Sequence, residues 1–122
     1  MDAEFAQRWV ARLRDPDLPQ GKEFLRSPAG YCCLAVAELE RGRTFIASEA
    51  ERTDPSQLLN HARHLTLETR EAIGMFSIFG VPRGGVKIII DGQAYCSLSN
   101  ANDHGVTFAK IADWIEANHQ HL

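Results

Sequence analysis

Apolar residues recur with helical spacing near both ends of the chain, and each series follows a residue that commonly caps helices. The first series, behind Asp2, is Phe5, Trp9, Val10 and Leu13. The second, behind Thr107, is Phe108, Ile111, Ala112 and Ile115. A single apolar stripe is typical of a helix packed on a core, and Asp or Thr accepts hydrogen bonds from first-turn amides. The sequence therefore predicts a helix at each end, the first stopped by Pro16 and Pro19.

The segment Tyr31–Leu39 has no polar face before Glu38, and it follows the turn signal Ser27–Gly30. A short apolar run of this kind suits either a buried strand or a buried helix. Its alanines, and Gly42 as a C-terminal cap, favour a helix. We therefore place the centre of the core in this segment.

The middle of the chain carries three further signals. Arg43–Ala47 suits a short extended piece. Thr53-Asp54-Pro55 has the pattern of a helix start, with an apolar side formed by Leu58, Leu59, Ala62 and Leu65. Thr66 is expected to cap a further short helix that ends at Gly74.

A β-hairpin is the clearest local prediction. Val86–Ile90 and Ala94–Leu98 are rich in β-forming residues, and Asp91-Gly92 lies between them. The residues at 100–105 have the composition of a turn-rich loop. Together the patterns predict an α+β fold in one domain, 1–122, with about four helices around Tyr31–Leu39 and one hairpin.

Composition narrows the function classes. The chain has 122 residues, 44% hydrophobic and 24% charged, with a net charge of −3. The basic residues form no run, so nucleic-acid binding is not expected. The first residues lack the pattern of a secretory signal, and no segment has the 18 or so apolar residues of a membrane helix, so we expect a cytoplasmic protein without a membrane partner. The three cysteines, two of them adjacent, do not make a disulfide framework.

Cys32 and Cys33 allow two interpretations. A thiol at the first turn of a helix has a lowered pKa and can act as a nucleophile. A cysteine hydrolase would then use Cys32, with Gln20 as the oxyanion donor, His104 as the base and Asn102 or Asp103 to orient it. In the alternative, both cysteines are small hydrophobes of the core. The apolar neighbours of the pair favour the core.

Binding of an anion is the other chemistry that the residues suggest. Gln20, Lys22 and Arg26 flank the segment that leads into the core, Arg83 lies in the Gly-rich stretch 82–85, and the 102–105 loop precedes the last helix. Metal binding is not predicted, because His61 and His64 form only a pair and His119 and His121 lie at the chain end. No cofactor is predicted.

Blocks at both ends resemble a family of small, uncharacterised bacteriophage and prophage proteins. Members carry QGKGxLR…YCCLGVLCDL and end in LNDxGxSFxxIADxIE. The matching residues here are Trp9–Arg14, Gln20-Gly21-Lys22, Leu25-Arg26, Tyr31–Val36, Asn102-Asp103, Gly105, Thr107-Phe108, Ile111–Asp113 and Ile115-Glu116. The resemblance covers about 40 residues at the start and about 20 at the end. The middle departs from the family, and His104 falls at a variable position.

The resemblance implies a phage-encoded accessory protein in the host cytoplasm, where such proteins often counter host defence. Two modes follow: masking a host protein, or sequestering a nucleotide signal. We therefore expect binding without catalysis, to a host protein or a small anionic, nucleotide-like ligand, with a cysteine hydrolase as the alternative. The residues expected to bind are Gln20, Lys22, Arg26, Arg83, Asn102, Asp103 and His104. The apolar Val86–Ile90 strand is also compatible with a homo-oligomer.

Overall fold

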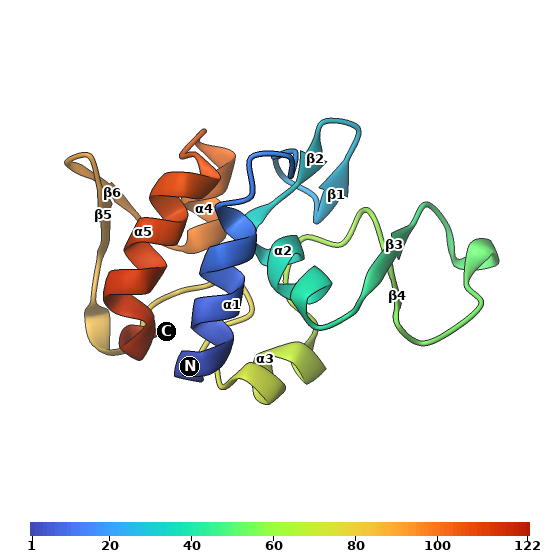
Figure 1. Ribbon diagram of the computed structural model, residues 1–122, viewed down its shortest axis with the longest axis horizontal. Helices are drawn as coiled ribbons and strands as arrows, with labels where there is room; N and C mark the ends of the chain where they lie inside the picture. Colours follow the sequence, from blue (N-terminus) through green and yellow to red (C-terminus); the bar gives the residue numbers. More distant parts are fainter.

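Helix α2 (Cys33–Glu40) packs against α1 (Ala3–Leu13) and α4 (Leu98–Asp103), and α5 (Phe108–Asn118) packs against α1 and α4, in the computed structural model, which describes residues 1–122 (Figure 1). Every residue of α2 from Cys33 to Glu38 is buried. The indole N–H of Trp9 donates to the carbonyl of Cys33 at 3.0 Å, which ties α1 to the start of α2. The Tyr31–Leu39 segment is thus a helix for most of its length and lies in the core, as predicted.

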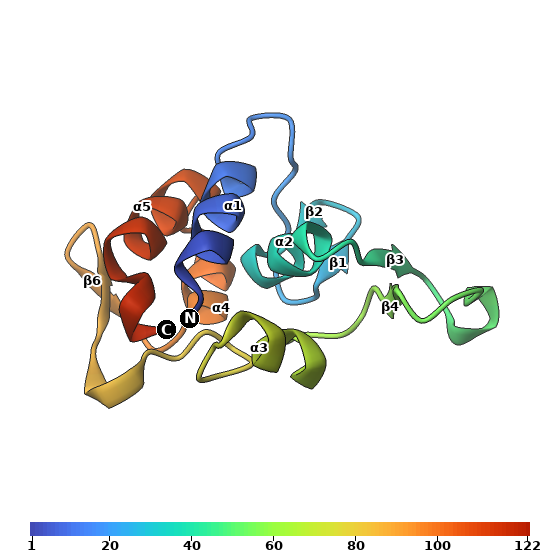
Figure 2. The same ribbon diagram turned by 60° about the horizontal axis from the view of Figure 1, so that its bottom comes forward.

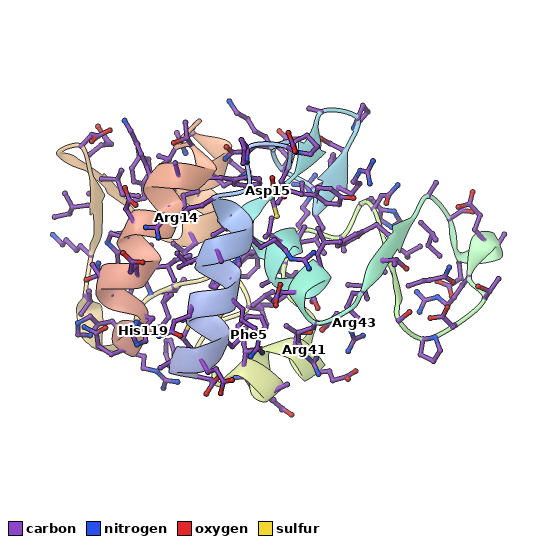
Figure 3. The ribbon with its side chains drawn as sticks, viewed as in Figure 1. Phe5, Arg14, Asp15, Arg41, Arg43 and His119 are labelled. Carbon is purple, nitrogen blue, oxygen red and sulfur yellow. The ribbon has the colours of Figure 1, made fainter.

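Helices α1 and α5 lie side by side, so the two chain ends are neighbours (Figures 1 and 2). Figure 3 shows Arg14 at the end of α1 beside α5, where its guanidinium pairs with Asp113 at 2.7 Å and Glu116 at 2.9 Å. The hydrogen bonds that Arg14 donates to Glu116 and Asp113 raise the pKa of Arg14, and the bond that Glu116 accepts lowers the pKa of Glu116. This exposed cluster joins residues about a hundred positions apart.

The predicted helix caps are confirmed. Asp2 accepts from the amide of Phe5 at 2.7 Å, and Thr107 accepts from the amide of Lys110. Thr66 accepts from the amide of Thr69 at the start of α3 (Leu67–Ile73), which ends at Gly74. These local bonds satisfy first-turn amides that have no partner within the helix.

A buried carboxylate attaches α3 to α2. Glu38 is fully buried, and its Oε2 accepts from the amide of Thr66 at 2.9 Å while its Oε1 accepts from the hydroxyl of Thr69. The same hydroxyl accepts from the guanidinium of Arg41 at 3.0 Å. Figure 3 shows Arg41 and Arg43 between the end of α2 and α3, and Arg43 pairs with Glu68 at 2.7 Å. The buried polar group is satisfied, as burial requires.

The hairpin predicted around Asp91-Gly92 is present. Strands β5 (Ile88–Ile90) and β6 (Gln93–Tyr95) are antiparallel, and both turn residues have positive φ, 52° at Asp91 and 78° at Gly92. This is the backbone geometry of the two-residue turns that match strand twist. Ile88 and Ile90 are buried, whereas Ile89 is 56% exposed. The homo-oligomer suggested by this strand stays a prediction.

Two further strand pairs were not predicted. Strands β1 (Arg26–Ser27) and β2 (Gly30–Tyr31) form a small hairpin at the Ser27–Gly30 turn. Strand β3 (Thr44–Ile46), expected as an extended piece, pairs in parallel with β4 (Gln57–Leu59). The chain between them contains the 3₁₀ turn η1 (Glu49–Glu51), and residues 44–59 project from the helices as an arm (Figure 2).

The helix predicted to begin at Thr53-Asp54-Pro55 and run through Leu58, Leu59, Ala62 and Leu65 is wrong. Side chains close a turn there instead: Gln57 accepts from the amides of Thr53 and Asp54, and Asp54 accepts from the amide of Ser56 at 2.8 Å. Strand β4 follows at once. Such local bonds compete with helix formation. A sequence pattern within this segment also does not reveal that β4 pairs with β3.

The turn-rich loop predicted at 100–105 is wrong in its first part, because α4 extends to Asp103. Ser97 accepts from the amide of Asn100 at 3.0 Å and starts this helix, so the second hairpin strand ends at Tyr95 rather than Leu98. The predicted α+β class is confirmed. The fold has five α-helices, where about four were predicted, and three two-stranded sheets, where one hairpin was predicted. It also contains the short 3₁₀ turns η2 (Arg83–Gly85) and η3 (His119–His121). None of the helices has the length and apolarity that a bilayer span requires.

Candidate functional site

A groove of about 440 Å³ lies between the β1–β2 hairpin and the base of the arm. Residues from three chain segments line it: Phe24, Arg26, Ser27, Pro28, Phe45, Asn60 and His61. Backbone hydrogen bonds hold these segments together, from the amide of Leu25 to the carbonyl of Ala62 at 2.6 Å and from the amide of Arg26 to the carbonyl of Asn60 at 3.1 Å. We call this hollow the aromatic groove.

Two arginines stack on aromatic rings here: Arg26 lines the aromatic groove, and Arg63 lies beside it on the ring of Phe24. The guanidinium carbon of Arg26 lies 4.5 Å from the ring centroid of Tyr31, and that of Arg63 lies 4.7 Å from the centroid of Phe24. Arg26 also donates to the hydroxyl of Tyr31 at 2.6 Å. The Tyr31 ring packs on Phe45, with 5.8 Å between centroids. Stacking of this kind orients a guanidinium while leaving its edge free for an anion.

Neither Arg26 nor Arg63 forms an ion pair, and no carboxylate lines the aromatic groove. Both side chains are exposed. The arginines at α1, by contrast, are paired: Arg8 and Arg12 within the helix with Glu4 or Glu40, and Arg14 at its C-cap with Asp113 and Glu116. The aromatic groove therefore concentrates uncompensated positive charge in a protein whose net charge is −3.

Asn60 lines the same hollow, and its side-chain amide makes no hydrogen bond within the protein. Its Oδ1 is buried and has no partner, the single side-chain polar atom in the protein of which this is true. Buried polar atoms without a partner are rare in folded proteins. The aromatic groove thus holds an unused hydrogen-bonding group besides its free charges.

Other hollows lack this combination. The one beside α1 is larger, about 530 Å³, but its cations Arg8 and Arg12 pair with Glu40. The hollow of about 350 Å³ at Arg41 and Arg43 has no apolar lining, and Glu68 lies within it. The volume of a hollow is therefore a weaker guide to a ligand site than its lining residues, because ligand sites combine apolar surface with a few polar groups that are free to bind.

Gln20 and Asn102, expected at a binding site, instead bond to each other and to the backbone. Gln20 Nε2 donates to Asn102 Oδ1 at 2.9 Å and to the carbonyl of Val106 at 2.8 Å, and its Oε1 accepts from the amide of Phe108. Asn102 is fully buried; its Oδ1 accepts from the amide of Cys33, and its Nδ2 donates to the carbonyl of Gly21. The two amides are occupied in holding α2, α4 and α5 together.

Lys22, Asp103 and His104 lie on the surface near this network. Asp103 accepts from the amide of Glu23 at 2.8 Å, and His104 Nδ1 lies 2.8 Å from the carbonyl of Asn100. A β-carbon added at Gly105 would lie 3.6 Å from the Lys22 ammonium, so Lys22 and the 102–105 segment are neighbours.

Arg83 lies apart from them. It stacks on Phe76 and donates to the carbonyl of Gly74 at 3.1 Å. Of the residues expected to bind, Arg26 is the one that lines the aromatic groove.

The two adjacent cysteines belong to the core. Cys32 is 3% exposed and Cys33 is fully buried. Cys32 caps α2, where its sulfur accepts from the amide of Ala35 at 3.4 Å. Burial nevertheless raises the pKa of Cys32 to about 11 and the pKa of Cys33 well above its usual value. His104 hydrogen-bonds to Asn100 and not to Cys32, so this arrangement does not support the hydrolase alternative.

The histidines do not gather around a point. His61 lines the aromatic groove, while His64 contacts the carbonyl of Leu65 and packs its ring against Phe79. No group of three or more His, Cys, Asp or Glu side chains is placed to hold a metal ion.

Sequence reasoning missed most of the aromatic groove. Phe24, Phe45, Asn60 and Arg63 were not singled out, and His61 was considered only as a metal ligand. Their common property, aromatic rings next to basic or amide residues in three short segments, is visible in the sequence. This property indicates a site only when β3 pairs with β4 and brings Phe45 and Asn60 together.

Comparison with known proteins returns no relative. No family model, curated protein or solved structure matches the chain.

Proposed function

We propose that the protein binds a small anionic, nucleotide-like ligand in the aromatic groove and does so without catalysis. The observation that carries the proposal is the state of Arg26 and Arg63. Each is exposed, stacked on an aromatic ring and free of any carboxylate partner. Guanidinium groups in this state are suited to bidentate binding of phosphate.

The other lining residues suit the ring of a nucleotide. Phe24 and Phe45 offer aromatic surface, and stacking of a base on an aromatic side chain contributes about 1–3 kcal/mol. The volume, about 440 Å³, is within the range of small-molecule sites. Ser27 and His61 add a hydroxyl and an imidazole for the sugar or phosphate.

The resemblance to phage and prophage proteins supplies the biological setting of this proposal. In the cytoplasm of an infected cell, a protein that holds a nucleotide signal without altering it would remove that signal from the host. Masking of a host protein is the competing mode, and the same experiment separates the two.

The test is a calorimetric titration with AMP, GMP, CMP and UMP. We expect saturable binding of at least one nucleotide, and stabilisation of the folded state by mass action. The Arg26→Gln variant should bind at least about tenfold more weakly, because a charge-assisted hydrogen bond contributes about 1.5–3 kcal/mol. Arg83→Gln is the matched control, since Arg83 is also unpaired and stacked on a ring, Phe76, outside the aromatic groove.

Two results would overturn the proposal. A panel without binding would leave masking of a host protein as the function. Equal losses in Arg26→Gln and Arg83→Gln would show that nucleotides are held elsewhere or by net charge alone.

A further inference from the structure

Asn60 combines a fixed backbone with a free side chain. Its amide donates to the carbonyl of Ile46 at 2.8 Å, and its carbonyl accepts from the amide of Arg26 at 3.1 Å. The side-chain Oδ1, by contrast, has no partner although it is buried. The residue is therefore held at the wall of the aromatic groove while its amide group is unused.

The fold does not explain why an asparagine stands at this position. Where asparagines serve the fold of this protein, their amides are bonded: Asn102 contacts Cys33, Gly21 and Gln20, and Asn118 donates to the carbonyl of Trp114. An unsatisfied acceptor at position 60 costs stability, and an apolar residue there would not. An unsatisfied group of this kind in a folded protein calls for an explanation, and a ligand that bonds to it supplies one.

The amide can turn to meet a ligand. The terminal torsion of asparagine has broad, shallow preferences, and no hydrogen bond holds this one. Turned toward the hollow, the side chain offers one acceptor, Oδ1, and one donor, Nδ2. A ligand edge that matches it carries one donor next to one acceptor.

We infer that the aromatic groove binds adenine in preference to a pyrimidine base or to a purine that lacks the exocyclic amine. The exocyclic amine of adenine donates to Asn60 Oδ1 while a neighbouring ring nitrogen accepts from Nδ2, the pairing that asparagine commonly makes with this base. The two fused rings also give more stacking surface on Phe24 and Phe45 than a pyrimidine does. This inference rests on the proposed function and specifies the ligand of the same site.

The experiment compares AMP with purine riboside 5′-monophosphate, which is AMP without its amine, and with CMP, in calorimetric titrations of the whole protein. One bidentate pair of hydrogen bonds discriminates by about 5- to 150-fold. The wild type should therefore bind AMP more tightly than the deaminated analogue by a factor in that range, and more tightly than CMP.

Two variants test whether Asn60 causes the preference for AMP. Asn60→Leu should bind AMP and the analogue with equal affinity, and both more weakly than the wild type binds the analogue, because the bond from Nδ2 to the ring nitrogen is lost as well. A circular dichroism spectrum like that of the wild type shows that the variant is folded. Asn60→Asp keeps an acceptor for the amine but replaces the Nδ2 donor with a charged oxygen that repels the lone pair of the ring nitrogen, so it should bind both ligands more weakly and still prefer AMP. This near-isosteric variant keeps the test decisive where Asn60→Leu does not fold.

The outcomes separate this inference from the proposed function. Equal affinity of the wild type for AMP and its analogue, or a preference for CMP, overturns adenine selection and leaves nucleotide binding in place. A preference for AMP that survives in Asn60→Leu overturns the role of Asn60. Absence of binding by every nucleotide overturns the proposed function and this inference together.

Discussion

Two asparagines of this protein show how the same side chain serves different ends at the scale of single residues. Asn102 is fully buried and bonds to the backbone of two distant segments and to Gln20. Asn60 has a free amide at the wall of a solvent-open groove. The first satisfies groups that burial would otherwise leave without partners, and the second is available to a ligand.

Replacing Asn102 with Ala should destabilise the protein by about 2–4 kcal/mol, because the buried amide of Cys33 and carbonyl of Gly21 lose their partner. Chemical denaturation followed by circular dichroism measures this change. The exposed neighbour provides the control, and Asp103→Ala should cost less than about 1 kcal/mol. Equal and small effects in both variants would contradict the structural role given to Asn102.

The cysteines should differ sharply in reactivity. Iodoacetamide applied to the native protein between pH 5 and pH 9 should label Cys96, which is exposed, and leave Cys32 and Cys33 unmodified until the protein is denatured. Burial raises the pKa of Cys32 to about 11, so its thiol stays protonated and unreactive throughout that range. Mass spectrometry of each site is the measurement. Fast labelling of Cys32 at low pH would instead support the alternative that the protein is a cysteine hydrolase.

At the scale of elements, the parts that were predicted correctly depend on neighbours in sequence. Asp2, Thr66 and Thr107 each cap the helix that follows directly, and Asp91-Gly92 closes its own hairpin. These signals are local, so a sequence pattern can reveal them. The helix predicted from Asp54 failed because the competing structure, strand β4, depends on pairing with β3 across the arm.

Two glycines in turns allow the cost of a strained backbone to be compared with and without a steric clash. Gly92 and Gly80 have nearly equal positive φ, 78° and 77°, but a β-carbon at 92 meets open space and one at 80 would lie 2.8 Å from Leu98. Gly92→Ala should cost about 1 kcal/mol for its left-handed backbone alone. Gly80→Ala should cost at least about 2 kcal/mol, because the clash in the core adds to the strain. Equal thermal stabilities of the two variants would contradict this packing.

At the scale of the whole molecule, the helical body and the projecting arm differ in how many of their residues are buried. The body contains nearly all the buried residues, whereas none is buried between 47 and 57. The aromatic groove lies where the arm leaves the body, between parts held by backbone hydrogen bonds. A site at such a junction is fixed in position and open to solvent.

Amide hydrogen exchange should map this division. Residues 47–56 should exchange rapidly, because they contribute nothing to the core, and residues 35–38 of α2 should exchange through global unfolding only. Mass spectrometry of proteolytic fragments can resolve the two regions. Strong protection of residues 47–56 in the isolated protein would show that the arm is covered, as it would be in an oligomer.

The candidate site was less predictable than the fold for a physical reason. Arg26 was expected to bind because it is basic and near the core segment, but its neighbours come from distant segments. Phe45 is placed by the pairing of β3 with β4, and Asn60 and Arg63 are placed by backbone bonds between the segments at 25–26 and 60–62. Gln20 and Asn102 were expected at a ligand site, and the structure instead bonds their side-chain amides to each other at 2.9 Å. Their role was not foreseen, because residue type does not distinguish a buried amide from an exposed one.

The most direct test of nucleotide binding in the aromatic groove is a titration with AMP followed by NMR of the arginine side chains. The Nε–H signals of Arg26 and Arg63 should shift in a saturable way, and that of Arg83 should stay unchanged, because only the first two are at the groove. Shifts confined to Arg83, or no shift at any arginine up to millimolar AMP, would contradict the account.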